Sequence, residues 1–295
     1  MQPKILILIA SFNGGKFLKE QLASILCQVD VDVNVIISDD NSTDDTIDVI
    51  NAFSSVYGDK VSLVNRSEND VRKRGSFENF LSLTRLVDVQ SYDFVAYADQ
   101  DDIWLPTKLS YGVSQLSFHG ASAFSSGFFI LKGLNVDLTY INKRKRYVEF
   151  DFFFQSGGPG CTYILESSHF RYFQKFCAAT DFDKFDIKYF DWLIYAYFRS
   201  NNFCWIISDS SHMLYRQHGS NVLGANAGVF ALFKRLKMIL SGEYISSCRA
   251  MLSLFSSNSK ITVKDVLEFR NIFNLRRSFL ESAFFWFYFK FFVRL

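Results

Sequence analysis

The first hundred residues alternate between segments that predict buried β-strands and segments that predict amphipathic helices. Four short apolar or β-branched runs are typical of strands in a parallel sheet: residues 5–10, 31–37, 60–65 and 94–98. Apolar residues recur at helical spacing between these runs, and we expect Ser42 or Thr43 to cap the second helix. This rhythm predicts an α/β fold with a doubly wound, mainly parallel sheet flanked by helices. Ligands of such sheets bind beyond the carboxyl ends of the strands.

The middle of the chain has a less regular pattern. We expect the following elements there: a strand at 121–131, a loop at 136–147, a helix at 183–199, and short strands at 205–208 and 213–216. After Gly224 the sequence becomes rich in Leu, Phe, Lys and Arg, which indicates helices of a different character. We therefore predict two domains: residues 1–225, and a basic, aromatic-rich helical extension of residues 226–295.

The composition is that of a globular protein in a reducing compartment. Of the 295 residues, 49% are hydrophobic and 21% are charged, which excludes a disordered chain. The five cysteines are scattered without a C-x-x-C pair, so they indicate neither a disulfide framework nor a zinc site. The first apolar run is too short for a signal peptide, and no uncharged apolar stretch reaches the roughly 18 residues of a membrane-spanning helix. We expect a cytoplasmic protein.

Charge is distributed unevenly along the chain. The net charge is +2, but residues 229–295 contain 11 Lys and Arg against 4 Asp and Glu, which leaves residues 1–228 with a net charge of −5. Aromatic side chains also dominate the last 18 residues, from Ser278 to Leu295. Basic and aromatic residues together favour the interface of an anionic membrane, so we predict peripheral contact with the inner face of the cell membrane. The alternative is that these Phe residues pack onto the rest of the chain or onto a second subunit.

Two acidic clusters stand at the predicted carboxyl ends of strands. Asp39 and Asp40 follow the second strand, and residues 99–102 (Asp-Gln-Asp-Asp) follow the fourth. Carboxylates that face one crevice repel each other unless a cation joins them, and Mg²⁺ and Mn²⁺ prefer oxygen ligands that they share with substrate phosphates. The alternative is that these residues only form turns and cap helices.

Seven segments, in order and with matching spacing, resemble the family-2 glycosyltransferases of the GT-A fold. Four lie in the first half of the chain: Ile9–Gly14, Glu20–Gln28, Ile37–Asp44 and Asp99–Trp104. Three lie further on and are similar to a bacterial branch that includes rhamnosyltransferases: Gly160–Thr162, Asp191–Trp192 and Tyr215–Gly224. The resemblance covers residues 4–225 and implies an inverting transferase that uses a nucleotide-diphosphate sugar.

The resemblance assigns roles on the donor side of the site. Four residues would line the pocket for the base and ribose: Ala10, Ser11, Phe12 and Asp40. Asp99 and Asp101 would hold the Mg²⁺ or Mn²⁺ ion on the diphosphate, with Asp101 as the stronger candidate for direct coordination and Asp102 as its substitute. Arg216 would pair with phosphate oxygens, and His218 would either bind the metal or donate to the leaving phosphate.

On the acceptor side, the resemblance points to Asp191 as the general base that takes the proton of the attacking hydroxyl. Many relatives carry His just before this Asp, whereas this chain has Phe190, whose side chain cannot form a supporting hydrogen bond. Trp192 would either stack on a sugar ring or belong to the core. Gly160 ends a glycine-rich stretch that would form a wall beside the acceptor.

For the donor, we expect dTDP-rhamnose first and UDP-hexoses second. The expected acceptor is a glycan, including one linked to a polyprenyl diphosphate, as in the assembly of bacterial surface polysaccharides such as O-antigen. We expect no nucleic-acid partner, and the oligomeric state is open. The alternatives are a non-catalytic sugar-nucleotide-binding or scaffolding relative and, less favoured, a nucleotidyltransferase. The chain has no G-x-G-x-x-G motif and no P-loop, which argues against dinucleotide oxidoreductases and P-loop enzymes.

Overall fold

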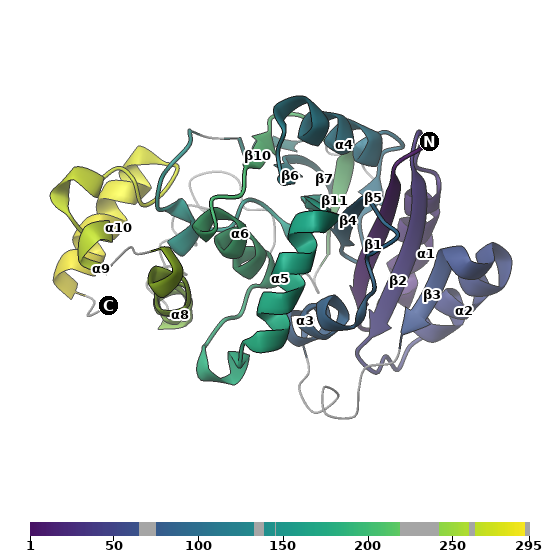
Figure 1. The fold of residues 1–295 in the computed structure, drawn as a ribbon. Coiled ribbons are helices and arrows are strands. Elements are labelled where there is room, and N and C mark those ends of the chain that lie inside the picture. The colour runs from purple at the N-terminus through teal and green to yellow at the C-terminus, as the bar shows by residue number, and fades with distance from the viewer. Residues whose placement is uncertain (65–74, 133–138, 145, 219–241, 260–262, 293–295) are drawn as a thin grey trace. The chain divides into compact units, whose positions relative to one another are not determined.

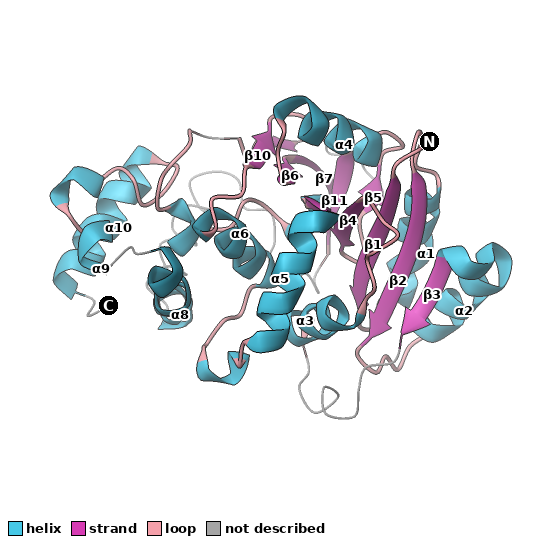
Figure 2. Ribbon diagram, viewed as in Figure 1, coloured by secondary structure: helices cyan, strands magenta, loops and turns pink. Residues whose placement is uncertain are grey.

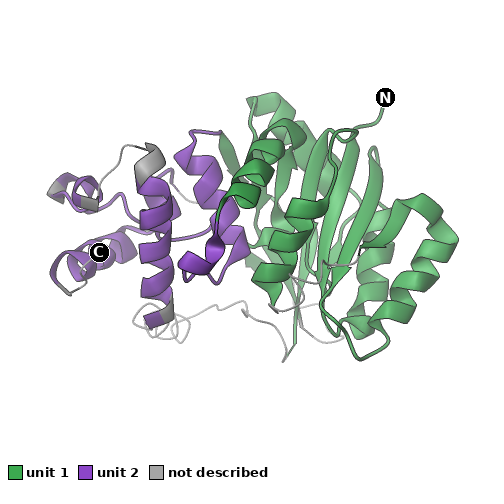
Figure 3. Ribbon diagram, turned by 60° about the horizontal axis from the view of Figure 1, so that its bottom comes forward, with its two compact units in different colours: residues 1–143, 158–180, 204–224 green, residues 144–157, 181–203, 225–295 purple. Residues whose placement is uncertain are grey.

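The computed structural model describes residues 1–64, 75–132, 139–144, 146–218, 242–259 and 263–292. The chain forms two compact units, coloured separately in Figure 3. Unit 1 consists of residues 1–143, 158–180 and 204–224, and unit 2 consists of residues 144–157, 181–203 and 225–295. Unit 2 thus combines the C-terminal region with two segments from the middle of the chain. The predicted boundary between residues 225 and 226 stays a prediction, and the motif residues 219–224 lie outside the described part.

The main sheet of unit 1 has seven strands in the order β10-β6-β9-β4-β1-β2-β3 (Figures 1 and 2). Their bounds are β1 (Lys4–Ser11), β2 (Asp32–Asp39), β3 (Val61–Val64), β4 (Phe94–Ala98), β6 (Ala123–Ser126), β9 (Ile164–Glu166) and β10 (Trp205–Ser208). β9 runs antiparallel to β4 and β6, and the other pairs are parallel. Residues 5–9 of β1 are fully buried, as expected for a central strand covered on both faces. The mixed α/β fold predicted from the sequence is confirmed.

The described part of unit 1 contains five α-helices: α1 (Gly15–Leu26), α2 (Thr46–Tyr57), α3 (Ser76–Leu86), α4 (Lys108–His119) and α5 (Ser167–Ala179). α1 packs with α2, and α3 packs with α5; in Figure 2, α3 and α5 lie in front of the sheet. The predicted cap of α2 is wrong, because the helix begins only at Thr46. The Ser42 hydroxyl instead donates a hydrogen bond of 2.6 Å to the Asp39 carboxylate.

The strand predicted at 121–131 is in fact two strands that belong to different sheets. β6 joins the main sheet, whereas β7 (Phe128–Lys132) joins a second sheet in the order β5-β11-β7-β8. The other members are β5 (Ile103–Trp104), β8 (Tyr140–Ile141) and β11 (Met213–Gln217). The chain changes sheets at Gly127, where a Cβ atom would overlap the carbonyl oxygen of Ile141, so only glycine fits this close approach. β8 also interrupts the predicted loop at 136–147, of which 136–138 and 145 lie outside the described residues.

Unit 2 is helical in its described part, with α6 (Phe190–Ser200), α8 (Gly242–Ser259), α9 (Val263–Val266) and α10 (Phe279–Phe292). The helix predicted at 183–199 starts seven residues later than expected. The chain first makes a short 3₁₀ turn at Phe182–Lys184, where the Asp181 carboxylate accepts the N–H of Asp183 and so favours a separate turn. None of the described helices is both long and apolar enough to cross a membrane.

The aromatic helix α10 has two distinct faces. Ser282, Phe285, Trp286 and Phe289 are buried, and the rings of Phe285 and Phe289 lie 6.2 and 5.3 Å from the ring of Phe154. The residues exposed along the other side are Leu280, Phe284, Phe287 and Phe291, which we call the α10 stripe. Their spacing of four, three and four residues places them on one side of the helix. One face of α10 therefore belongs to the core of unit 2.

Candidate functional site

Three parallel strands of unit 1 end at the same edge of the main sheet. β1 lies between β2 and β4, and Ser11 at the end of β1 is paired with Asp39 at the end of β2. The carboxyl ends of β2 and β4, with the loops that follow them, contain both acidic clusters that the sequence singled out. This carboxyl edge, visible in Figure 2, is the candidate site, in agreement with the general location of ligands on open α/β sheets.

The two aspartates after β2 make different contacts. Asp39 accepts hydrogen bonds from the Ser11 hydroxyl and from the backbone N–H of Ser42, both at 2.7 Å, so its carboxylate ties the β2 loop to β1. Asp40 is buried and accepts the N–H of Gly75 at 2.8 Å. Its backbone N–H donates to the Ser11 carbonyl at 2.8 Å. Asp40 is thereby held in place directly after β2, where the sequence predicts the base-binding carboxylate.

Gln100 clamps the loop after β1, a role that the sequence did not reveal. Its side-chain amide accepts the N–H of Phe12 at 2.9 Å and donates to the Phe12 carbonyl at 3.0 Å. A Cβ atom at Gly14 would overlap the Gln100 side chain, so glycine makes room for the clamp. Phe12 itself is half exposed, next to Ala10 and the buried Ser11 at the end of β1. The clamp fixes the segment that is predicted to line the base and ribose pocket.

The acidic cluster after β4 meets a cysteine from a distant segment. Ligand atoms of Asp99, Asp102 and Cys161 all lie within 4.8 Å of one another. Cys161 reaches the cluster because it follows Gly160 in the 3₁₀ turn Gly160–Thr162, which leads into β9 beside β4. Gly160, which the sequence predicts beside the acceptor, is thus the chain neighbour of a residue of the cluster.

Asp102 is fully buried, and one side of its carboxylate is incompletely satisfied. Its Oδ1 accepts the backbone N–H of Arg216 at 3.1 Å, whereas Oδ2 meets no N–H or O–H donor in the described part of the chain. Burial raises the pKa of Asp102 well above the usual carboxyl range, and the nearby charges of Asp99 and Asp101 raise it further. Burial likewise raises the pKa of the Cys161 thiol.

These residues fit a hard divalent cation. A cation beside Asp99 and Asp102 would satisfy the orphaned oxygen and favour the ionised carboxylates that burial disfavours. Carboxylate oxygens are the ligands that Mg²⁺ and Mn²⁺ prefer, whereas the Cys161 thiol is a soft ligand that burial keeps protonated. The structure thus groups the predicted Asp99 with Asp102, which the sequence analysis named as the substitute for Asp101, and adds Cys161 to them. Asp101 itself contacts a different residue.

Asp101 contacts His218, the other residue predicted on the metal side. The two side chains meet at 2.6 Å between Oδ2 and Nε2, and the imidazole stacks on the Phe17 ring with centroids 4.8 Å apart. Arg216, two residues earlier, donates from Nε to the Asp101 carbonyl at 2.8 Å and forms an ion pair with Glu20. The structure therefore joins β11 to the loop after β4 through both predicted residues, although more than a hundred positions separate them in the chain.

A buried lysine lies in the same region of unit 1. Lys108 begins α4; its ammonium group is 3.6 Å from the centroid of the Trp104 ring and has no hydrogen-bond acceptor among the residues described. Burial lowers the pKa of Lys108 to about 7, although the nearby Cys161 and Asp102 favour the charged form and raise the pKa in part. Burial of this lysine could not be predicted from the sequence, because a lysine at the start of a helix is ordinarily solvated.

Of the three residues predicted on the acceptor side, Asp191 and Trp192 belong to unit 2, whereas Gly160 belongs to unit 1. Asp191 lies in the first turn of α6, where a carboxylate is favoured by the helix dipole, and its Oδ1 accepts the N–H of Trp192 at 2.8 Å. Trp192 is buried; its indole N–H donates to the Phe152 carbonyl at 2.7 Å, and its ring stacks on Tyr244 with centroids 5.5 Å apart. The sequence left two alternatives for Trp192, stacking on a sugar ring or a place in the core. These contacts are those of a core residue.

Comparison with known proteins identifies the family. The model of glycosyl transferase family 2 matches residues 6–175. The chain is also 36% identical over 243 residues to the dTDP-rhamnosyl transferase RfbG of Shigella flexneri, a match that covers 80% of each protein. This chain belongs to glycosyl transferase family 2. A shorter match, 31% identical over 104 residues, relates this family 2 member to the β-1,3-glucosyltransferase WfaP of Escherichia coli and covers 35% of this chain and 38% of that protein.

Solved structures agree on the fold of this family 2 glycosyltransferase. TarS from S. aureus in complex with UDP-GlcNAc superposes with a TM-score of 0.54 at 13% identity, over 97% of this chain and 81% of TarS. The mannosyltransferase PcManGT from Pyrobaculum calidifontis, in complex with GDP-Man and Mn²⁺, gives a TM-score of 0.53 at 14% identity, over 87% and 76% of the two chains. At these identities the likeness shows the GT-A fold, which confirms the predicted class.

Proposed function

We propose that this glycosyltransferase transfers a sugar, with inversion, from a nucleotide-diphosphate donor to a glycan acceptor, and that the donor is dTDP-rhamnose. The observation that carries the donor assignment is the 36% identity to a dTDP-rhamnosyl transferase over 80% of both chains. A UDP-hexose is the second candidate, since the shorter match is to an enzyme whose name gives UDP-Glc as its donor.

On the donor side, the proposal assigns the nucleotide to the edge formed by β1 and β2. Asp40 would accept the imide N–H of thymine or uracil, and the Gln100 clamp would keep the Phe12 segment in place for the base and ribose. This pocket would select pyrimidines, because a carboxylate acceptor pairs with an imide N–H. Arg216 would exchange its contact with Glu20 for the diphosphate oxygens.

On the metal side, Asp99 and Asp102 would hold Mg²⁺ or Mn²⁺, with Asp101 and His218 beside them. The support is the orphaned Asp102 oxygen and the cluster within 4.8 Å. The cation, when bound, supplies Lewis-acid stabilisation of the charge that develops on the departing diphosphate. His218, which shares a hydrogen bond with Asp101, would either become a further ligand or donate a proton to a phosphate oxygen.

For the acceptor, we propose Asp191 as the general base. Inversion requires that the acceptor hydroxyl attack the anomeric carbon from the side opposite the diphosphate while it loses its proton to a carboxylate. The position of Asp191 at the start of α6 leaves its side chain at a helix end rather than within a packed face. Phe190 occupies the place where many relatives carry His, so we propose that the carboxylate acts without that support.

We further propose that the enzyme is cytoplasmic and attaches to the inner face of the cell membrane through the α10 stripe. Leu280, Phe284, Phe287 and Phe291 are exposed, with Leu280 at 86%, and an exposed aromatic row is costly in water. Attachment there would bring the enzyme to a glycan that grows on a polyprenyl diphosphate, as in surface polysaccharide assembly. Interfacial binding through one helix face needs no membrane-spanning segment.

The test is slow donor hydrolysis by the purified protein, measured with Mn²⁺ and a panel of dTDP-, UDP- and GDP-sugars. We expect dTDP-rhamnose to be hydrolysed fastest, and we expect Asp102→Asn to abolish hydrolysis and metal-dependent binding of dTDP in calorimetry. Asp209→Asn, at an exposed position of unit 1, is the matched control. A wild-type protein that binds dTDP but hydrolyses no donor would favour a non-catalytic sugar-nucleotide-binding relative instead.

A further inference from the structure

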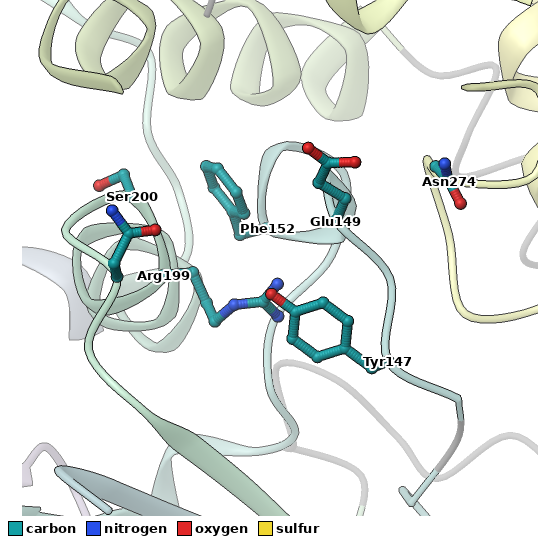
Figure 4. A pocket seen from close by; sticks show the side chains of 7 residues that line it. Tyr147, Glu149, Phe152, Arg199, Ser200 and Asn274 are labelled. Atoms are coloured by element: carbon teal, nitrogen blue, oxygen red, sulfur yellow. The ribbon is translucent and has the colours of Figure 1, made fainter. Parts of the chain in front are cut away.

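Unit 2 contains a cavity of about 510 Å³ that none of the predicted sites uses. Its lining residues come from three separate segments of unit 2: Tyr147, Glu149, Phe152, Arg199, Ser200, Asn202 and Asn274 (Figure 4). The volume falls in the range of about 300–1,000 Å³ that is common for small-molecule sites. The chemistry of the lining residues indicates which class of ligand the cavity can accept.

A buried charge network holds the cavity's lining in place. Arg199 donates to the Asp151 carboxylate at 2.9 Å and to the Val148 carbonyl at 2.9 Å, and Arg277 approaches the other Asp151 oxygen at 3.1 Å. The Tyr195 hydroxyl donates to the same carboxylate. Arg199 already donates hydrogen bonds to Asp151 and to a backbone carbonyl. It therefore supports the wall of the cavity and is not available as a cation for an anionic ligand.

Tyr147 provides an aromatic surface above this network. Its ring centroid lies 4.5 Å from the guanidinium carbon of Arg199, so a cation–π contact favours this position of the ring. The Tyr147 residue is nevertheless 78% exposed, so most of the ring remains accessible. Figure 4 shows the ring next to the Arg199 guanidinium. An anchored ring that stays accessible can stack on a ligand with little loss of conformational entropy.

The polar groups around the ring are suited to hydroxyl groups. Glu149 is exposed, and its carboxylate has no hydrogen-bond or ion-pair partner within the described ranges. Asn202 and Asn274 add side-chain amides, which both donate and accept hydrogen bonds. A carboxylate accepts bonds from adjacent hydroxyls and repels phosphate, while the aromatic ring packs against the C–H face of a sugar ring. The combination favours a neutral, polyhydroxylated ligand.

We propose that this cavity binds a neutral oligosaccharide, with Tyr147 stacking on a sugar ring and Glu149 accepting hydrogen bonds from its hydroxyls. The identification of this oligosaccharide as the glycan portion of the acceptor rests on the proposed function. The binding itself does not, since it requires neither donor nor metal. The cavity would then be a subsite that recognises the glycan away from the hydroxyl that reacts.

The test uses the full chain without donor or metal and measures saccharide binding by saturation-transfer NMR and calorimetry. The probes are maltotriose, triacetylchitotriose and a rhamnose disaccharide at millimolar concentration. We expect at least one probe to bind. Glu149→Gln and Tyr147→Ala should each weaken that binding by about tenfold, as expected for loss of a charge-assisted hydrogen bond or of a stacking partner. Tyr147→Phe should retain it, because the ring remains.

Tyr172→Ala is the matched control, because Tyr172 is an exposed tyrosine of α5 in unit 1 and should leave binding unchanged. Tyr147 and Glu149 are both exposed, so unfolding temperatures close to the wild type will verify that the variants fold. Failure of all three probes to bind the wild type, or binding that Tyr147→Ala and Glu149→Gln leave unaltered, overturns the proposal. Wild-type donor hydrolysis, measured separately, then shows whether the proposed function survives.

Discussion

Replacing Asp151 with Asn should destabilise unit 2 severely while hardly changing the shape of the side chain. Asp151 is 1% exposed, and its carboxylate balances two guanidinium groups, those of Arg199 at 2.9 Å and Arg277 at 3.1 Å. These arginine side chains are themselves only 8% and 10% exposed. Asp151→Asn removes the negative charge that Arg199 and Arg277 share, so both buried guanidinium groups lose this counter-charge.

The expected cost follows from this burial. Removing one partner of a buried ion pair typically costs about 3–5 kcal/mol, because the remaining charge is uncompensated. A unit of about this size should lose roughly 4 °C per kcal/mol, so the unfolding temperature should fall by about 12–20 °C. The matched control is Lys184→Ala, which removes an exposed ion pair with Asp181 in the same unit and should cost less than about 1 kcal/mol.

Differential scanning calorimetry of both variants measures the loss, and hydrogen exchange shows whether it occurs in α6. We expect faster exchange there because Tyr195 and Arg199, two residues of this helix, both contact Asp151. If Asp151→Asn costs no more than Lys184→Ala, the network does not stabilise unit 2 in the way that its geometry indicates, and the reasoning is refuted.

Three further predictions address the catalytic base, the buried lysine and the membrane contact. Asp191→Asn should lower the transfer rate by about 10²–10⁴-fold while donor affinity in calorimetry persists; a rate above roughly a tenth of the wild type would exclude the general-base role. The pKa of Lys108 is lowered from 10.5 to about 7 in the folded protein, so the unfolded chain binds one more proton between these values and stability should rise with pH across that window. In Lys108→Met, the free energy of unfolding, measured in urea from about pH 7 to pH 10, should rise less with pH than in the wild type. An equal rise in both proteins would contradict a lowered pKa of Lys108. Phe284→Ser combined with Phe287→Ser should abolish flotation with anionic liposomes, whereas Phe118→Ser, at an 82% exposed position of α4, should not; equal flotation of both variants would argue against the α10 stripe.

The sequence by itself determined the fold class and the edge of the sheet that holds the candidate site. Strands β1 to β4 match the apolar runs within two residues, because a buried parallel strand requires a continuous apolar segment whatever surrounds it. The location of the acidic clusters at the ends of β2 and β4 could also be predicted, because polar residues that follow a parallel strand lie at the carboxyl edge of the sheet. The ordered motifs of the family then indicated the activity.

Only the tertiary structure decided which of these residues meet. His218 contacts Asp101 across 117 positions, and Cys161 joins Asp99 and Asp102 from the segment that leads into β9. Contacts at such separations depend on strand order and on the path of loops, neither of which has a local period in the sequence. The clamp of Gln100 on Phe12 is of the same kind.

The aromatic C-terminal segment shows the same division most clearly. Its composition predicted an aromatic-rich helical extension, but it did not show which aromatic residues would be buried in the core. The structure buries Phe285 and Phe289 against Phe154 and leaves Phe284 and Phe287 exposed, so adjacent residues differ completely in environment. A helix that is apolar on all sides has no hydrophobic face to predict, and the choice of buried face is made only by the side chains that pack against it.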